Sequence, residues 1–215
     1  MPVPLVPVKA LSEAKGRLAP TVGPLQRRRL AIAMFEDVIA ALQAVPGLAD
    51  PVVVSPDREV WRRADAMGCR VVEEPPGTGD LNGALTAAAR VVGNGSPLLV
   101  VAADLPLASA AGLERVLAAA EAPVAVVPSH DGGGTNVLAW RDPASFAPSF
   151  GPDSAARHLA VPGAVRVDEP GLALDVDTAA DLELVAGRLD PSSVTARRLR
   201  DLAMLPQVTG STEEA

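Results

Sequence analysis

The chain has 215 residues, of which 48% are hydrophobic, and its formal net charge is −7 at pH 7. This size suits one domain with a sizeable core, and the negative charge argues against a general nucleic-acid-binding protein with a basic face. No apolar run is long enough to span a bilayer and the first ten residues lack the marks of a signal peptide, so we expect a cytoplasmic protein without nucleic-acid or membrane partners.

The first 129 residues alternate between predicted strands and helices. Short apolar runs predict strands at 3–8, 51–55, 69–74, 97–104 and 123–129. Helical periodicity predicts helices at 24–45, 57–68, 80–93 and 108–122. Asp57 is the expected N-cap of the second helix. This alternation is typical of an α/β fold with a mostly parallel sheet and helices on both faces.

The alternation ends after Ser129. The segments 135–140, 164–169 and 172–177 are predicted strands without long helices between them. We therefore expect the second half of the chain to add mixed or antiparallel strands at the edge of the sheet.

Two further helices are predicted at 178–189 and 191–205. The first has Thr178 followed by Asp181, a weaker form of the capping box. We expect one domain over 1–190. Residues 191–215 are expected to form a C-terminal helix and polar tail, within that domain or as an extension of it.

Cations gather after the first predicted strand. Lys9 and Lys15 are the only lysines of the chain, against seventeen arginines, and Arg17 follows them. Ligands of such sheets bind beyond the carboxyl ends of the strands. The two lysines lie together either by chance or because this loop grips a polyphosphate.

Three aspartates lie at the ends of predicted strands, and they suggest a metal site. Asp104 ends the apolar strand 97–104, and Asp175 and Asp177 stand two apart in 172–177, so that they face one side of an extended chain. Carboxylate oxygens together with phosphate oxygens are typical ligands of Mg²⁺. The alternative is that Asp177 caps the helix at 178–189 and Asp175 is solvated.

A glycine triplet, 132–134, stands before Thr135 and Asn136. Glycine loses much backbone freedom on ordering, so the triplet indicates either a tight turn or a ligand that approaches bare backbone. The fingerprints of NAD-binding and P-loop proteins are absent from the sequence. His130 and His158 lack metal-site spacing, and we interpret each as a polar supporting residue rather than a general base.

Several segments in matching order resemble one known family. They are PVKALSEAKGRLAP, LN at 81–82, ADLP at 103–106, GGGTNVL, FGPDSAARH and DVDTAADL. Over about 3–184, they resemble the 2-phospho-L-lactate and phosphoenolpyruvate guanylyltransferases of deazaflavin coenzyme F-420 biosynthesis. The resemblance implies a three-layer nucleotidyltransferase fold of the nucleotide-diphospho-sugar transferase type, with a mostly parallel sheet and added mixed strands.

The resemblance also implies roles for individual residues. Asp104, Asp175 and Asp177 would bind Mg²⁺. From the repulsion between two phosphates, we further expect Lys9, Lys15 and Arg17 to hold the triphosphate of GTP and Asn82 to touch the nucleoside, with Lys9, Lys15 and Asp104 as the catalytic groups. The phosphorylated three-carbon acid would be held by Gly134, Thr135, Gly151 and Ser154. In this view the glycines form a turn whose N–H groups also bind an anion.

The implied reaction is attack of the acid's phosphate on the α-phosphorus of GTP, with release of pyrophosphate. The sequence leaves open whether the acid is phosphoenolpyruvate, 2-phospho-L-lactate or 3-phosphoglycerate. A homodimer is compatible with the sequence. Two alternatives remain open, a GT-A-type glycosyltransferase with an Asp-x-Asp metal site and a non-catalytic nucleotide-binding module.

Overall fold

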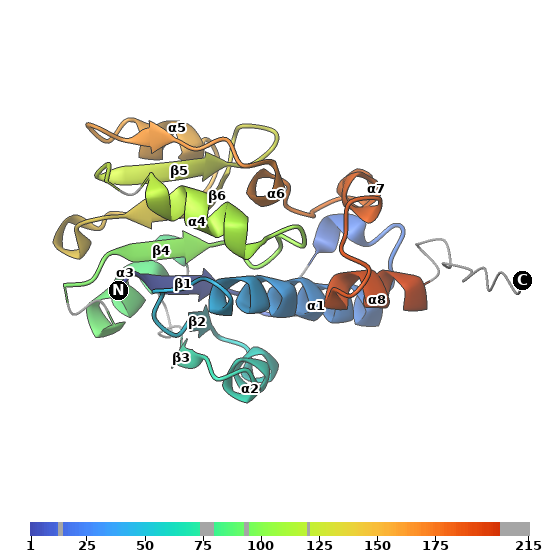
Figure 1. Ribbon diagram of the computed structural model, residues 1–215. Helices are drawn as coiled ribbons and strands as arrows, with labels where there is room; N and C mark the ends of the chain where they lie inside the picture. The colour runs from blue at the N-terminus through green and yellow to red at the C-terminus, as the bar shows by residue number, and fades with distance from the viewer. Residues whose placement is uncertain (13–14, 74–79, 93–94, 120, 203–215) are drawn as a thin grey trace, which may run out of the picture.

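The computed structural model describes residues 1–12, 15–73, 80–92, 95–119 and 121–202, and within them seven strands form one sheet (Figure 1). The strands follow the order β3-β2-β1-β4-β6-β5-β7 across the sheet. Their bounds are Val3–Pro7 (β1), Val52–Ser55 (β2), Arg70–Glu73 (β3), Leu98–Val101 (β4), Val124–Pro128 (β5), Thr135–Trp140 (β6) and Val165–Arg166 (β7). Strands β1 to β6 coincide with predicted strands to within a few residues.

Strand β6 lies inside the sheet, so the expectation that antiparallel strands would stand at the edge was wrong. It pairs antiparallel with β4 on one side and with β5 on the other, whereas the remaining pairs are parallel. All six of its residues are buried, and such an apolar strand is better covered between two neighbours than at a solvated edge. Because β6 runs against β4, its first residues, Thr135 and Asn136, lie beside the carboxyl end of β4.

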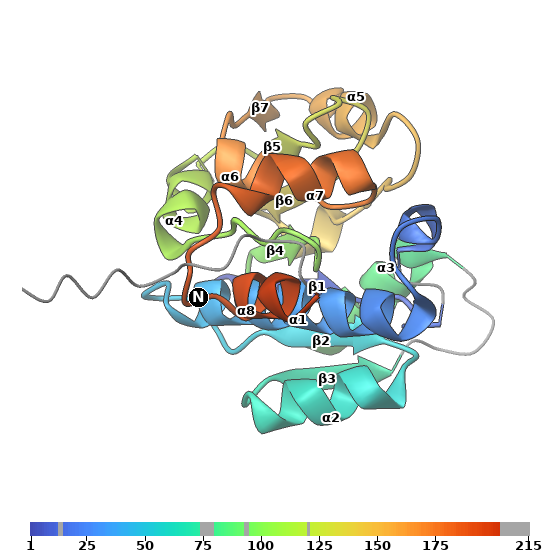
Figure 2. The same ribbon diagram turned by 90° about the vertical axis from the view of Figure 1, so that its right-hand side faces the viewer.

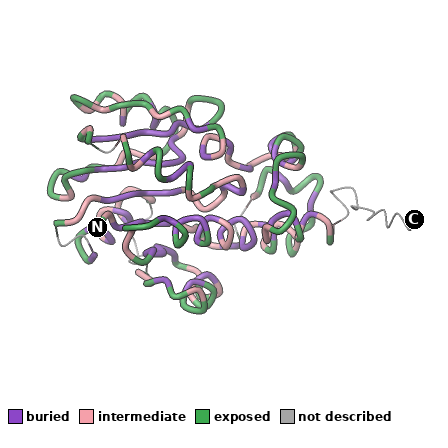
Figure 3. The backbone as a smooth tube through the Cα atoms, in the orientation of Figure 1, coloured by how far each residue is buried: buried purple, intermediate pink, exposed green. Residues whose placement is uncertain are grey.

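Helices cover both faces of the sheet. One face carries α1 (Pro24–Gln43), α2 (Arg58–Ala66), α4 (Ala110–Ala118) and α6 (Pro170–Ala173), and the other carries α3 (Leu81–Val92) and α5 (Ser154–Leu159). Side chains that alternate along a strand supply both cores, since Val6 packs with the α1 side and Leu5 with the α3 side. Figure 3 shows the central strands as long buried stretches. None of the described helices is both long and apolar enough to cross a membrane.

A third apolar cluster joins α1 to α7 (Ala179–Ala186) and α8 (Val194–Asp201), and α8 lies beside α1 in Figure 2. Leu30 of α1 packs there with Leu182 and Leu199. Asp37 of α1 accepts hydrogen bonds of 2.8 Å from the first two N–H groups of α8. The segment after residue 190 is thus held against α1 as far as it is described, and residues 203–205 of the predicted helix lie outside the described residues.

The segment 172–177 is not a strand, although its sequence predicted one. Its first residues belong to the short helix α6, which begins at Pro170, a residue that favours the first turn. Residues 174–177 form no strand ladder, because β4 already pairs with β1 and β6 and offers no free edge. One backbone hydrogen bond joins this segment to the loop after β4, in which Val176 N donates to Asp104 O at 3.2 Å. This bond brings Asp175 and Asp177 beside Asp104.

Two predicted helix starts are confirmed. The Asp57 side chain accepts from Glu59 N at 2.8 Å, and Thr178 with Asp181 forms a reciprocal capping box. Thr178 is therefore the N-cap of α7. The alternative role of Asp177 as that cap was wrong, which leaves its carboxylate for other contacts.

Candidate active site

A cavity of about 890 Å³ opens beyond the carboxyl ends of β1, β2 and β4. Its wall is formed by the loop after β1, by the 3₁₀ turn η1 (Gly16–Leu18), by the start of α3 and by the residues after β4. Six predicted site residues line it, namely Lys9, Lys15, Arg17, Asp104, Thr135 and Asp177. Residues that the sequence placed near the ends of different strands thus line one cavity, as expected for a mostly parallel sheet.

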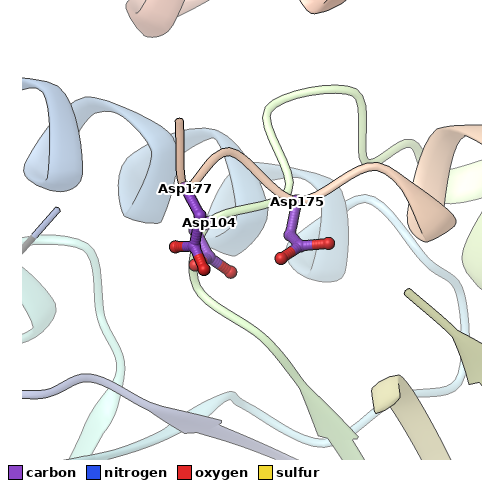
Figure 4. A group of neighbouring side chains, drawn as sticks. All are labelled: Asp104, Asp175 and Asp177. Atoms are coloured by element: carbon purple, nitrogen blue, oxygen red, sulfur yellow. The ribbon is translucent and has the colours of Figure 1, made fainter. Parts of the chain in front are cut away.

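Asp104, Asp175 and Asp177 form an acidic trio (Figure 4), of which Asp104 and Asp177 line this cavity. One carboxylate oxygen from each lies within 4.8 Å of those of the other two. Asp104 comes from the loop after β4, and the other two come from the chain between α6 and α7. Burial raises the pKa of Asp175, with the charges of Asp104 and Asp177 adding to the effect. Three carboxylates this close favour a bound cation.

Lys15 supplies a cation to the trio. Its Nζ lies 2.5 Å from Asp104 Oδ2 and 3.1 Å from Asp177 Oδ1, and its side chain is only 8% exposed. Burial alone would lower the pKa of Lys15, but the two carboxylates outweigh it and the pKa is raised. The backbone of Lys15 is left-handed, with φ of 54°, and this places the ammonium group at the trio.

The other two predicted cations are more exposed. Arg17 Nη1 lies 3.7 Å from Asp177 Oδ2 with a side chain that is 77% exposed. Lys9 is exposed at the cavity wall. Their exposure lets both turn toward an anion in the cavity, although Arg17 would give up its long contact with Asp177, whereas Lys15 is held by two carboxylates at shorter distances.

The acidic trio fits a divalent cation such as Mg²⁺. Its donors are carboxylate oxygens on one side of a large cavity, which is the ligand type that this ion takes together with substrate phosphates. The ammonium group of Lys15 shows that this position accepts positive charge. Asp104, Asp175 and Asp177 would hold the ion.

Asn136 is a supporting residue whose role the sequence did not reveal. Its Nδ2 donates to Asp175 Oδ1 at 3.1 Å and to the carbonyl oxygens of Leu172 and Ala173 at 3.1 and 2.8 Å. His130 lies near the same oxygen, with Nδ1 3.7 Å from Asp175 Oδ1. The sequence signal for a role of Asn136 was its position next to Thr135. Its hydrogen-bond partners could not be predicted, because they lie 36 or more residues away along the chain.

The glycine triplet forms a turn that holds itself together. The N–H groups of Gly132, Gly133 and Gly134 donate to Ser129 O, Asp131 Oδ1 and Ser129 Oγ, at 2.8, 3.0 and 2.7 Å. Only Gly132 among them has positive φ, of 79°. A Cβ at Gly134 would lie 2.8 Å from Ser129 Oγ, so this glycine is required by the side chain of Ser129. The turn is confirmed, and these N–H groups are already used within it.

Thr135 and His158 are in contact beneath this turn. Thr135 Oγ1 lies 2.9 Å from His158 Nδ1, and His158 Nε2 accepts from Ser149 N at 2.9 Å. Burial, with a smaller contribution from Arg157, lowers the pKa of His158 from its ordinary 6.5 to about 4. His158 is therefore neutral at pH 7 and ties β6 to the loop before α5.

The neutral state of His158 predicts a pH dependence of stability. In the unfolded chain His158 has its ordinary pKa of 6.5, so between pH 6.5 and about 4 the unfolded state binds a proton that the folded state does not. The fold therefore loses stability as pH falls through this range. Between pH 7 and pH 5 the loss from this group is about 1–2 kcal/mol. We expect a smaller decrease in the free energy of unfolding in His158→Gln, with urea unfolding at both pH values as the measurement. Equal decreases in the two proteins would show that His158 titrates normally.

The described residues that line the cavity do not include five predicted site residues, namely Asn82, Gly134, Gly151, Ser154 and Asp175. The Asn82 amide is paired with the Phe150 backbone, accepting from its N at 2.6 Å and donating to its O at 3.1 Å. Gly151 has φ of 123°, which side-chain-bearing residues rarely adopt, and Ser154 is 1% exposed. Asn82 thus supports the Phe150 wall of the cavity in this structure, and its contact with a nucleoside stays a prediction.

Comparison with known protein families gives one match that covers most of the chain. The model of the family described as guanylyl transferase CofC like matches residues 3–192. Phosphoenolpyruvate guanylyltransferase of Nocardia farcinica is 45% identical over 206 residues, which is 92% of this chain and 90% of the relative. The proteins of the same name from Streptomyces coelicolor and Sphaerobacter thermophilus are 44% and 37% identical, over 83% and 86% of this chain and 86% and 92% of the relatives.

Solved structures of low sequence identity share the fold. A Desulfovibrio desulfuricans protein assigned to the nucleotide-diphospho-sugar transferases superposes with a TM-score of 0.75 at 17% identity, over 95% of this chain and 96% of the other. A nucleotidyl transferase of Methanothermobacter thermautotroptrophicus gives a TM-score of 0.61 at 17% identity, over 86% and 96%. The expected nucleotide-diphospho-sugar transferase-like fold is confirmed.

Proposed function

The chain belongs to the family of CofC-like guanylyl transferases, and we propose that it transfers GMP from GTP to the phosphate of phosphoenolpyruvate with release of pyrophosphate. Relatives at 37–45% identity carry the name of that activity, which supports phosphoenolpyruvate as the acid. 2-Phospho-L-lactate is the alternative acid, because it carries the same phosphate and carboxylate groups and differs only in having a single bond where phosphoenolpyruvate has a carbon–carbon double bond. We place the reaction in deazaflavin coenzyme F-420 biosynthesis, following the resemblance of the sequence segments to that family.

The observation that carries the proposal is the placement of Lys15 within the acidic trio at the wall of the cavity. A site for transfer between two phosphates must offset the repulsion between anions. Here one buried ammonium group, two further cations at the wall and a carboxylate set suited to Mg²⁺ lie together. Bound Mg²⁺ would supply positive charge to the phosphate oxygens of both substrates.

The residues around the cavity can hold and orient the reactants without a general base. A phosphate monoester is mostly dianionic at neutral pH because its second pKa is about 6, so the acid's phosphate needs no proton removed. Lys9 and Arg17 are exposed and can turn toward the triphosphate, and Lys15 can donate to it from the trio side. The Thr135 hydroxyl lines the cavity and can donate to the acid. Leu81 and Phe150 give part of the cavity an apolar wall.

A direct assay separates this function from its alternatives. The protein is incubated with GTP and Mg²⁺ and, in turn, with phosphoenolpyruvate, 2-phospho-L-lactate and 3-phosphoglycerate, and pyrophosphate release and product mass are recorded. We expect the fastest release with phosphoenolpyruvate and a product of GMP joined to the acid. A GT-A-type glycosyltransferase would instead consume a nucleotide-sugar, and a nucleotide-binding module would release no pyrophosphate with any acid.

Loss of a hydroxyl at the acid site is predicted to affect the acid and not GTP. Thr135→Val keeps the shape of the side chain and removes its donor. A hydrogen bond to a charged group contributes about 1.5–3 kcal/mol, so affinity for the acid is expected to fall by roughly one to two powers of ten. Ser154→Ala is the second variant, and titration of the acid at fixed GTP is the measurement. Unchanged acid affinity in both variants would show that the acid binds elsewhere.

A further inference from the structure

His158 is a buried side chain that joins the two segments assigned to the acid. It is 1% exposed, and it connects Thr135 at the start of β6 with Ser149, which precedes α5. Its ring also packs edge-on against the ring of Phe150, with 5.0 Å between the centroids, and Phe150 lines the cavity. The proposed reaction uses no histidine as an acid or base, so the contacts of His158 must serve a different purpose.

The hydrogen bonds of His158 determine which nitrogen carries the proton. Ser149 N–H can only donate, so His158 Nε2 must accept with its lone pair. In a neutral imidazole the proton then resides on Nδ1. Nδ1–H therefore donates to Thr135 Oγ1, which lies 2.9 Å away. Burial keeps the ring neutral by lowering its pKa to about 4.

The direction of this bond decides what Thr135 presents to a ligand. Since Thr135 Oγ1 accepts from His158, its own hydrogen stays available for another acceptor, and Thr135 lines the cavity. With the opposite tautomer, Thr135 would donate to the ring and present lone pairs to the cavity, which repel an anion. A hydroxyl held as a donor is what a phosphate or carboxylate oxygen requires.

We propose that His158 is a positioning residue that fixes the Thr135 hydroxyl as a hydrogen-bond donor to an anionic oxygen of the phosphorylated acid. The proposal rests on the proposed function, since it assigns the acid to the Thr135 side of the cavity. It goes beyond that function because it gives a role to His158, which is not one of the described residues that line the cavity.

A matched pair of substitutions separates the two hydrogen bonds of His158. In His158→Asn the side-chain amide can stand near the position of Nδ1 and still donate to Thr135, while the partner of Ser149 N is lost. In His158→Gln the amide oxygen can reach the position of Nε2 and accept from Ser149 N, while the donor to Thr135 is lost. Both variants remove the ring, so loss of the Phe150 contact is common to them.

The test is calorimetric titration of the whole protein and both variants with phosphoenolpyruvate, and separately with GTP. We expect His158→Gln to weaken phosphoenolpyruvate binding about tenfold, the effect of one hydrogen bond to a charged group, and His158→Asn to weaken it much less. GTP binding is expected to change less than twofold in both. In a Thr135→Val background, His158→Gln should add no further loss, because the two residues act through one hydroxyl.

Several results would overturn the proposal. The proposal fails if His158→Gln binds phosphoenolpyruvate with wild-type affinity, or if His158→Gln and His158→Asn lose equal affinity. It also fails if the losses from Thr135→Val and His158→Gln add in the double variant. If His158→Gln does not fold, a tenfold loss in folded His158→Asn decides against the proposal, and retained affinity supports it. Absence of phosphoenolpyruvate binding by the wild-type protein would instead contradict the proposed function, and this inference with it.

Discussion

Asp104→Asn is expected to lower turnover by a factor on the order of 10²–10³ at saturating GTP, acid and Mg²⁺, with the fold unchanged. The substitution keeps the size of the side chain and leaves Asp104 O free to accept from Val176 N. It removes one negative charge from a trio whose oxygens lie within 4.8 Å of one another. The ion that these oxygens would hold then has a neutral amide oxygen in place of a charged carboxylate and is bound more weakly. Asp177→Asn is expected to behave alike.

The measurement is the rate of pyrophosphate release, with thermal unfolding as the check on the fold. Glu183→Gln provides the matched control, because Glu183 is an exposed carboxylate on α7 with no part in the trio. It removes one negative charge by the same chemical change and is expected to leave turnover unaltered. Turnover of Asp104→Asn close to that of the control would remove the assignment of the trio as a metal site.

Lys15→Met is expected to weaken GTP binding by roughly one to two powers of ten, and phosphoenolpyruvate binding less, because the triphosphate carries the larger charge. Methionine keeps the length and burial of the side chain but lacks its charge. In the absence of a metal ion, the three carboxylates then repel one another more strongly, because the nearest cation is lost and the exposed Arg17 lies 3.7 Å from Asp177. We therefore also expect Mg²⁺ to raise the unfolding temperature of Lys15→Met more than that of the wild-type protein.

Lys9→Met is the comparison for this prediction. Lys9 is the other lysine of the chain, and it is exposed at the same cavity wall. Its loss is expected to weaken GTP binding less and to leave the response of the unfolding temperature to Mg²⁺ as in the wild-type protein. Equal effects of Lys15→Met on both substrates, together with an unchanged response to Mg²⁺, would contradict the role assigned to Lys15.

Much of the fold was predictable because strands and helices alternate with clear periodicity. The place of the cavity followed, since residues after β1 and β4 must meet at one edge of a parallel sheet. Local capping signals such as Asp57 and Thr178 were also reliable, because their partners lie within three residues along the chain.

What the sequence could not supply depends on contacts between distant segments. Residues 172–177 have the alternation of a strand, but strand formation requires a free sheet edge, and β4 has none. Two sets of hydrogen bonds join elements that no local sequence pattern relates. Asn136 donates to Asp175, and His158 bonds to both Thr135 and Ser149. The sequence also could not show what holds the glycine turn, because Ser129, which binds two of its three N–H groups, is a common residue with no distinctive signal, and the role of the turn in binding an anion stays a prediction.

The most direct test of the proposed reaction follows the oxygen atoms of the acid's phosphate. The protein is incubated with GTP, Mg²⁺ and phosphoenolpyruvate whose three non-bridging phosphate oxygens are ¹⁸O, and the products are weighed by mass spectrometry. Attack of this phosphate on the α-phosphorus of GTP predicts a product of GMP joined to phosphoenolpyruvate that retains all the label, with unlabelled pyrophosphate in equal amount. Label in pyrophosphate, or pyrophosphate released without the joined product, would contradict the account.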